Sequence, residues 1–161
     1  MKTTNYRSRF LSSLAAIAIA GSLFITSCDK DDDDNNNNKI YNLSGNATGA
    51  QEVPPVSTTA TATLTGTYNK DTKQLNWTIN WTGLSGDVTA AHFHGPASPG
   101  ESAGPLQAIT ITTNGMSGSA SGTATASDDL DDALLNGKAY YNLHTALYPD
   151  GEIRAQVALN Q

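Results

Sequence analysis

Two neighbouring segments of this chain alternate strictly between apolar and polar residues, and this pattern constrains the fold most. Threonine fills every second position of residues 59–67, and Gln, Asn and Thr fill every second position of residues 74–82. The intervening positions are small or apolar: Ala60, Ala62, Leu64, Tyr68, Leu75, Trp77, Ile79 and Trp81. A period of two is typical of half-buried antiparallel strands, with one face in a core and the other in water.

Other segments fit the same architecture. Residues 138–146 and 152–160 form a predicted hairpin across the turn Pro149-Asp150-Gly151. A short helix is predicted between Ser127, a suitable N-cap, and Gly137, which is placed to end it. Further strands are predicted near residues 39–44, 87–93, 106–113 and 118–126. The fold class is therefore all-β, an antiparallel Greek-key sandwich or barrel with one short helix.

The first 27 residues have the composition of a targeting segment. Three basic residues, Lys2, Arg7 and Arg9, precede an apolar run that is too short and too rich in small residues for a membrane-spanning helix. The run ends in Ile-Thr-Ser followed by Cys28, the only cysteine. This sequence resembles the lipobox of bacterial lipoproteins, in which the cysteine is acylated and becomes the mature N-terminus. A free or buried thiol is the alternative.

An acidic, asparagine-rich run follows Cys28. Residues 28–38 offer no apolar surface to bury, which predicts a disordered tether between the anchor and one domain at residues 39–161. Lys30-Asp31-Asp32 resembles the export signal of Bacteroidetes lipoproteins. We therefore expect a lipid-anchored protein of the outer membrane that is exposed on the cell surface.

The net charge bears on possible partners. Without the three basic residues of the leader, the chain carries six basic and 15 acidic residues, a formal charge of −9. Nucleic acid is therefore not an expected partner, because phosphate binding requires a basic surface. The membrane is the expected partner through the lipid anchor, and the sequence identifies no protein or small ligand.

The chain has three histidines, His92, His94 and His144. His92 and His94 share one face of a predicted strand, with β-carbons roughly 7 Å apart, so they can converge on one ion. His144 would complete a three-nitrogen set for copper or zinc, and Glu152 is a candidate fourth ligand or hydrogen-bond partner of a histidine. The alternatives are a structural hydrogen-bond network and a site for an organic ligand or peptide.

Four stretches taken together resemble the CHRD domain, which is named for chordin and is common in bacterial exported proteins. They are LSGNATGAQEVPPV (43–56), AHFHGPASPGESAGPL (91–106), GKAYYNLHT (137–145) and YPDGEIRAQV (148–157). The resemblance implies an all-β extracellular domain and supplies no reaction. Glu52 and Arg154 lie within these stretches and are candidates for a buried ion pair with a structural or ligand-binding role.

Two functions follow from these observations. The chain shows no recognisable set of nucleophile, base and oxyanion donors, so we name no catalytic residue; this favours a non-enzymatic role and leaves enzyme activity open. The leading hypothesis is a surface-anchored lipoprotein that carries a non-enzymatic CHRD binding or structural module. The alternative is a transition-metal binding or redox domain that holds copper or zinc at the three histidines.

Overall fold

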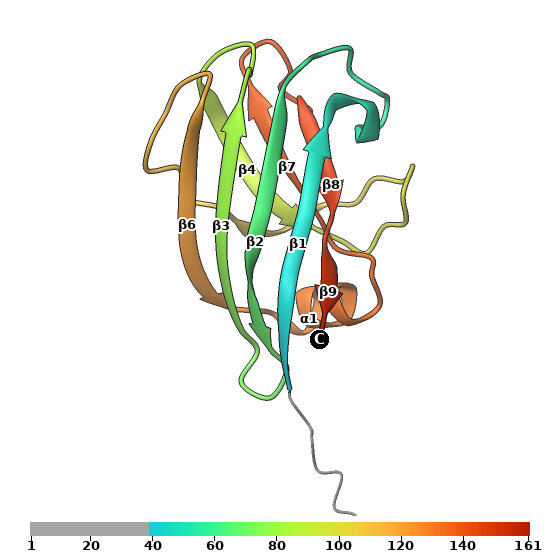
Figure 1. Cartoon of the computed structure of the whole chain (residues 1–161). Helices are drawn as coiled ribbons and strands as arrows, with labels where there is room; N and C mark the ends of the chain where they lie inside the picture. Colours follow the sequence, from blue (N-terminus) through green and yellow to red (C-terminus); the bar gives the residue numbers. More distant parts are fainter. Residues whose placement is uncertain (1–38) are drawn as a thin grey trace, which may run out of the picture. The chain divides into compact units, whose positions relative to one another are not determined.

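One antiparallel sheet, curled on itself, is the framework of residues 39–161, the part of the chain that the computed structural model describes (Figure 1). Its strands are β1 (Ile40–Thr48), β2 (Thr61–Asn69), β3 (Gln74–Thr82), β4 (Val88–His94), β5 (Pro105–Ala108), β6 (Gly118–Thr125), β7 (Tyr140–Thr145), β8 (Ile153–Gln156) and β9 (Ala158–Asn160). A 3-10 turn, η1 (Gly49–Gln51), follows β1. Cys28 and the leader and tether segments lie outside the described residues.

The strand order explains the curled shape. Neighbouring strands follow the order β5-β4-β7-β8-β1-β2-β3-β6, and β9 pairs with β1. In Figure 1 the strands β1, β2, β3 and β6 form one side, and β4 and β7 lie behind them. Trp77 on β3 meets Phe93 on β4 edge to face, with ring centroids 5.4 Å apart, so the two sides close over one core. The predicted all-β antiparallel class with one short helix is confirmed.

The alternation of residues 59–67 and 74–82 determines which side chains form this core. Leu64 and Ile79 are cross-strand partners in the β2–β3 hairpin, and each is 1% exposed. Trp77 and Trp81 are likewise buried, whereas Asn76 and Asn80 face outward. Both hairpin strands therefore follow the predicted pattern.

The helix α1 (Asp128–Leu135) also follows the prediction. The Ser127 hydroxyl accepts a hydrogen bond from the backbone N–H of Leu130, and Gly137 has a φ of +65° just after the helix. Leu130 and Leu134 are buried, and Tyr68 of β2 donates a hydrogen bond to Asp131. Within residues 39–161, no helix has both the length and the apolar character needed to cross a membrane.

The pairing of β4 with β7 positions the histidines. His92 lies opposite Asn142, and Ala90 lies opposite His144. All six residues of β7 are buried, so neither of its faces is open to water. The loop of residues 95–104 covers the even-numbered face, where its carbonyls accept hydrogen bonds from His94 and Arg154. The predicted strand near 106–113 is shorter than expected and ends at Ala108.

Candidate metal centre

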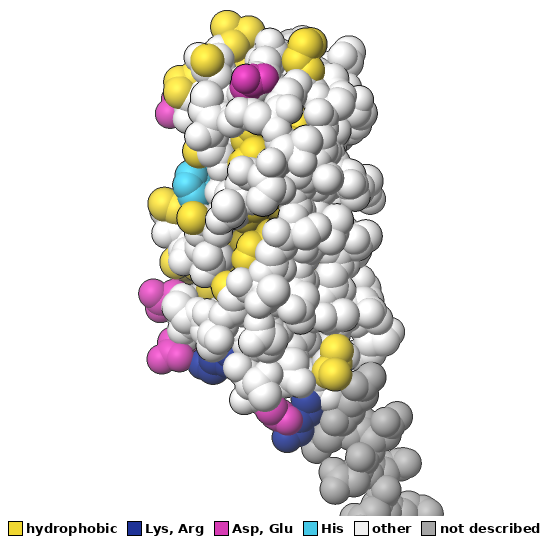
Figure 2. Space-filling view, turned by 90° about the vertical axis from the view of Figure 1, so that its left-hand side faces the viewer, with side chains coloured by type: hydrophobic (Ala, Val, Ile, Leu, Met, Phe, Trp, Pro, Cys, Tyr) yellow, Lys and Arg dark blue, Asp and Glu magenta, His cyan; other side chains and the backbone are white. Residues whose placement is uncertain are grey.

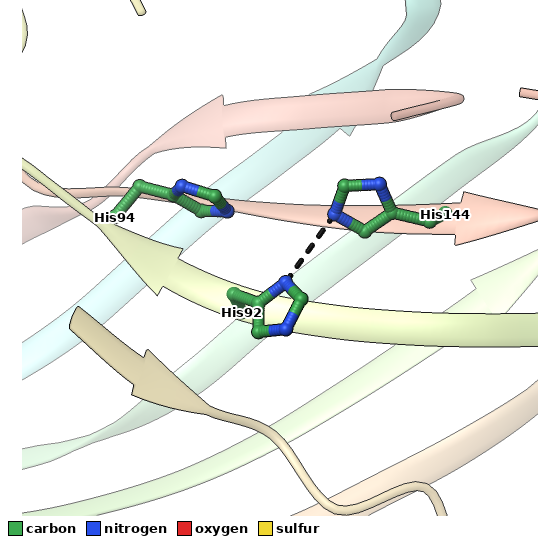
Figure 3. A group of neighbouring side chains, drawn as sticks. All are labelled: His92, His94 and His144. Carbon is green, nitrogen blue, oxygen red and sulfur yellow. Dashed lines mark hydrogen bonds between the residues drawn. The ribbon is translucent and has the colours of Figure 1, made fainter. Parts of the chain in front are cut away.

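The three histidines, far apart in sequence, converge on one point of the fold. His92 and His94 project from β4 and His144 from β7, with their rings turned toward one another (Figure 3). One nitrogen of each ring lies within 4.8 Å of the corresponding nitrogens of the other two. Among residues 39–161 these three side chains form the one group of His, Cys, Asp and Glu with such spacing. The predicted juxtaposition is present.

The spacing is close to that of ligands on one ion. Nδ1 of His92 lies 3.3 Å from Nε2 of His144. Two imidazole nitrogens at about 2.0–2.1 Å from a tetrahedral zinc ion are about 3.3–3.4 Å apart. The pair already has this separation, and a nitrogen of His94 lies within 4.8 Å of both.

Backbone carbonyls orient two of the rings. Nδ1 of His144 donates to the carbonyl oxygen of Pro149 at 2.8 Å, and Nδ1 of His94 donates to that of Ala103 at 2.9 Å. Each bond fixes the tautomer in which the neutral ring keeps a lone pair on Nε2. Metal-binding histidines usually have this arrangement, in which one ring nitrogen donates to a carbonyl and the other is left to bind the ion.

Burial favours the neutral form of the two β4 histidines. Burial is the main cause that lowers the pKa of His94, against the opposing effect of its hydrogen bonds to Ala103 and Asn142. Burial also lowers the pKa of His92, and the neighbouring His144 and His94 lower it further. A ring that stays neutral near pH 7 offers a lone pair rather than a proton.

The centre is accessible from one side. His94 and His144 are buried, whereas His92 is half-buried. Figure 2 shows a histidine side chain that reaches the surface among hydrophobic side chains. An ion can therefore approach without rearrangement of the sheet.

Glu152, the expected fourth ligand, lies elsewhere. Its carboxylate accepts hydrogen bonds from the hydroxyl and backbone N–H of Ser85 and from the hydroxyls of Thr145 and Thr58. Thr145 belongs to the core-facing positions of β7, so this carboxylate is on the opposite face from the histidines. Glu152 lies at a bend just before β8, where the alternation of the strand does not hold.

The expected ion pair between Glu52 and Arg154 is not formed: in the described residues the ion pairs involve Lys39 and Lys73. Arg154, 2% exposed, instead donates to the carbonyl of Glu101 at 2.6 Å and to Oε1 of Gln156 at 2.8 Å. Its guanidinium lies 3.6 Å from the ring centroid of Tyr140. Arg154 therefore holds the loop that covers the site.

Tyr140 links Arg154 to the histidines. Its ring is stacked on that of His94, with centroids 4.7 Å apart. Its hydroxyl donates to the carbonyl of Ala103 at 2.9 Å, the same oxygen that accepts from His94. The position of the His94 ring is thus fixed by a side chain and by a loop.

Glu52 is a buried carboxyl with no ion-pair partner among residues 39–161. Burial raises its pKa to about 7, although the positive charge of Arg154 acts in the opposite direction. Glu52 lines two adjoining surface cavities of about 240 and 340 Å³, and Arg154 lines the larger one. Its Oε1 atom has no hydrogen-bond partner among the described residues.

Two residues of the site were not predicted as site residues, Asn142 and Tyr140. Asn142 is 2% exposed, and its Oδ1 lies 2.9 Å from Nε2 of His94. Tyr140 and Asn142 share the even-numbered face of β7 with His144. The alternation of this strand was therefore enough to predict that they lie beside the histidine.

Comparison with known proteins places the chain in a family. No curated protein matches it, and no solved structure matches it. The family model of the CHRD domain matches residues 43–157, a span that contains all three histidines as well as Glu52, Asn142 and Arg154. The chain therefore belongs to the CHRD domain family.

Proposed function

We propose that the domain is a non-enzymatic binding module whose ligand is a transition-metal ion, copper or zinc, held by His92, His94 and His144. The observation that carries this proposal is the convergence of three imidazole nitrogens within 4.8 Å of one another. Imidazole is a good ligand for both metals. The carbonyl partners of His94 and His144 support the assignment because they leave Nε2 of each ring as the ligand atom.

The composition of the site favours binding or storage over catalysis. The groups around the histidines are an amide, a phenol and backbone carbonyls, and Glu152 is engaged on the other face of the sheet. No carboxylate of the described residues joins the histidine group as a candidate general base. A redox role for bound copper is the second possibility, and it requires the same three ligands.

Bound metal after dialysis tests this proposal. The full-length protein, purified in detergent and stripped with a chelator, is loaded with Cu²⁺ or Zn²⁺ and dialysed against metal-free buffer. We expect about one ion per chain, as for a single closed site. His92→Ala and His144→Ala should each lose it. The absence of retained metal in the wild-type protein would refute the proposal.

Matched variants separate this site from adventitious binding. Asp129 and Asp132 are exposed on α1 and form part of an acidic surface. The double substitution Asp129→Asn with Asp132→Asn should leave the bound metal unchanged. If these substitutions remove the ion and the histidine substitutions do not, the ion binds the helix and not the proposed centre.

We further propose that the domain is anchored by acylated Cys28 to the outer membrane and displayed at the cell surface. The lipobox-like sequence before Cys28 and the Lys30-Asp31-Asp32 sequence after it support this. Cys28→Ala should release the protein from the membrane fraction, and unchanged attachment would contradict the anchor. Protease treatment of intact cells should degrade the wild-type domain but spare a variant with alanine at positions 30–32.

A further inference from the structure

Asn142 occupies a central position among the three histidines. It is the cross-strand partner of His92, and it lies two residues before His144 on the same face of β7. Its side chain is buried, with 2% exposed, and its Oδ1 atom is 2.9 Å from Nε2 of His94. An amide oxygen, an atom that metal ions also bind, thus lies beside the ring nitrogen of His94.

The contact between Asn142 and His94 brings two acceptors face to face. Nδ1 of His94 donates its hydrogen to the carbonyl of Ala103, so Nε2 of the neutral ring carries a lone pair. That lone pair points at the carbonyl oxygen of the Asn142 amide, which also has only lone pairs to offer. Such a contact is favourable only when a cation, either a proton or a metal ion, is bound between or beside the two atoms.

The carboxyl of Glu52 explains why the amide has this orientation. A β-carbon at Gly151 would overlap both Oε1 of Glu52 and Nδ2 of Asn142, so the carboxyl and the amide NH₂ group approach the same backbone atom. A carboxyl has an oxygen that accepts hydrogen bonds whether or not it is protonated, so it attracts the NH₂ end of the amide. The oxygen end is then directed toward the histidines.

We propose that Oδ1 of Asn142 is a fourth ligand, which completes an N₃O site with His92, His94 and His144. This inference rests on the proposed metal-binding function. A set of four protein ligands is typical of closed structural or storage sites, whereas catalytic sites keep one position for water. Because an amide oxygen is a hard donor, the set favours divalent Zn²⁺ or Cu²⁺ over Cu⁺.

The test compares the affinity for Zn²⁺ and the visible spectrum of bound Co²⁺ in the full-length wild type and in Asn142→Ala. Loss of a ligand should weaken Zn²⁺ binding by about tenfold or more. It should also change the Co²⁺ spectrum, because water replaces the amide oxygen. Asn142→Asp should bind Zn²⁺ more tightly than the wild type, since a carboxylate is a stronger ligand. Asn80→Ala, at an exposed position of β3, is the control and should change neither property.

The outcomes distinguish this inference from the proposed function. If the wild type binds Zn²⁺ and Asn142→Ala binds it as tightly or more tightly, Asn142 is not a ligand. Weaker binding with an unchanged Co²⁺ spectrum would also overturn the inference, because Asn142 would then act only by orienting His94. Should Asn142→Ala fail to fold, the Zn²⁺ affinity of Asn142→Asp is the deciding measurement. Zn²⁺ binding as tight as that of the wild type, or weaker, would refute the ligand role. A wild type that binds no metal instead refutes the proposed function itself.

Discussion

Nδ1 of His92 lies 3.3 Å from Nε2 of His144, although the two residues are 52 positions apart in the chain. The pairing of β4 with β7 brings them together, and Pro149 fixes the ring of His144 from the turn that follows β7. A third imidazole, that of His94, lies beside this pair. We therefore expect metal binding to require all three rings.

Metal should stabilise the folded protein through these rings. A ligand that binds the folded state alone at 100 times its Kd adds about 2.7 kcal/mol to the free energy of unfolding. We therefore expect Zn²⁺ to raise the Tm of the wild type and to leave the Tm of His144→Ala unchanged. Thermal unfolding with and without Zn²⁺ measures both, and an equal increase in the two proteins would place the binding elsewhere.

The stability of the metal-free protein should depend on pH through Glu52. Its pKa is raised from 4.5 to about 7 in the folded state, so the folded state favours the protonated carboxyl. The resulting stability is present below about pH 4.5 and is lost as the pH rises through about 7, on the order of 2 kcal/mol. Urea unfolding should show this loss in the wild type and not in Glu52→Gln. Glu101→Gln, at an exposed position, should keep the wild-type pH dependence, and a flat wild-type profile would contradict the prediction.

Gly151 should tolerate no side chain. Its φ is +128°, and a β-carbon there would overlap Glu52 and Asn142, so Gly151→Ala must displace the carboxyl or the amide. We expect a loss of about 3 kcal/mol or more in the free energy of unfolding, together with weaker Zn²⁺ binding. Gly100→Ala is a matched control, because Gly100 also has a positive φ but open space around it. It should cost only about 1 kcal/mol, and equal effects at the two positions would mean that contact with Glu52 is unimportant.

The guanidinium of Arg154 should be needed to hold the covering loop. A lysine at this position keeps the charge but loses the planar group that contacts Tyr140 and the carbonyl of Glu101. Arg154→Lys should lower the free energy of unfolding by about 2 kcal/mol. Backbone amides of residues 98–103 should exchange hydrogen faster than in the wild type. If exchange in this loop is unchanged, its order comes from other contacts.

The sequence was sufficient for those parts of the fold that local patterns determine. Alternation predicted the β2–β3 hairpin and the core side chains, and Ser127 and Gly137 predicted the limits of α1. Alternation also predicted that His92 and His94 lie on one face. These features are determined by residues close together in the sequence, so a period of two or a capping residue is enough to predict them.

The rest of the site depends on tertiary geometry, which no local sequence pattern predicts. The distance from His92 to His144 follows from the register of β4 against β7, which the structure establishes. Glu152 was expected near His144 from regular pairing, but the bend before β8 turns its carboxylate toward Ser85 and Thr145. Arg154 likewise pairs with loop carbonyls that lie more than 50 residues away in sequence, rather than with Glu52.

Anomalous diffraction from crystals of the Zn²⁺-loaded protein, recorded at the zinc absorption edge, tests the metal centre most directly. We predict one strong peak between the rings of His92, His94 and His144, within about 2.0–2.1 Å of each ligand nitrogen. Crystals with no peak among the three rings, or with zinc bound only at the acidic residues of α1, would contradict the proposed centre.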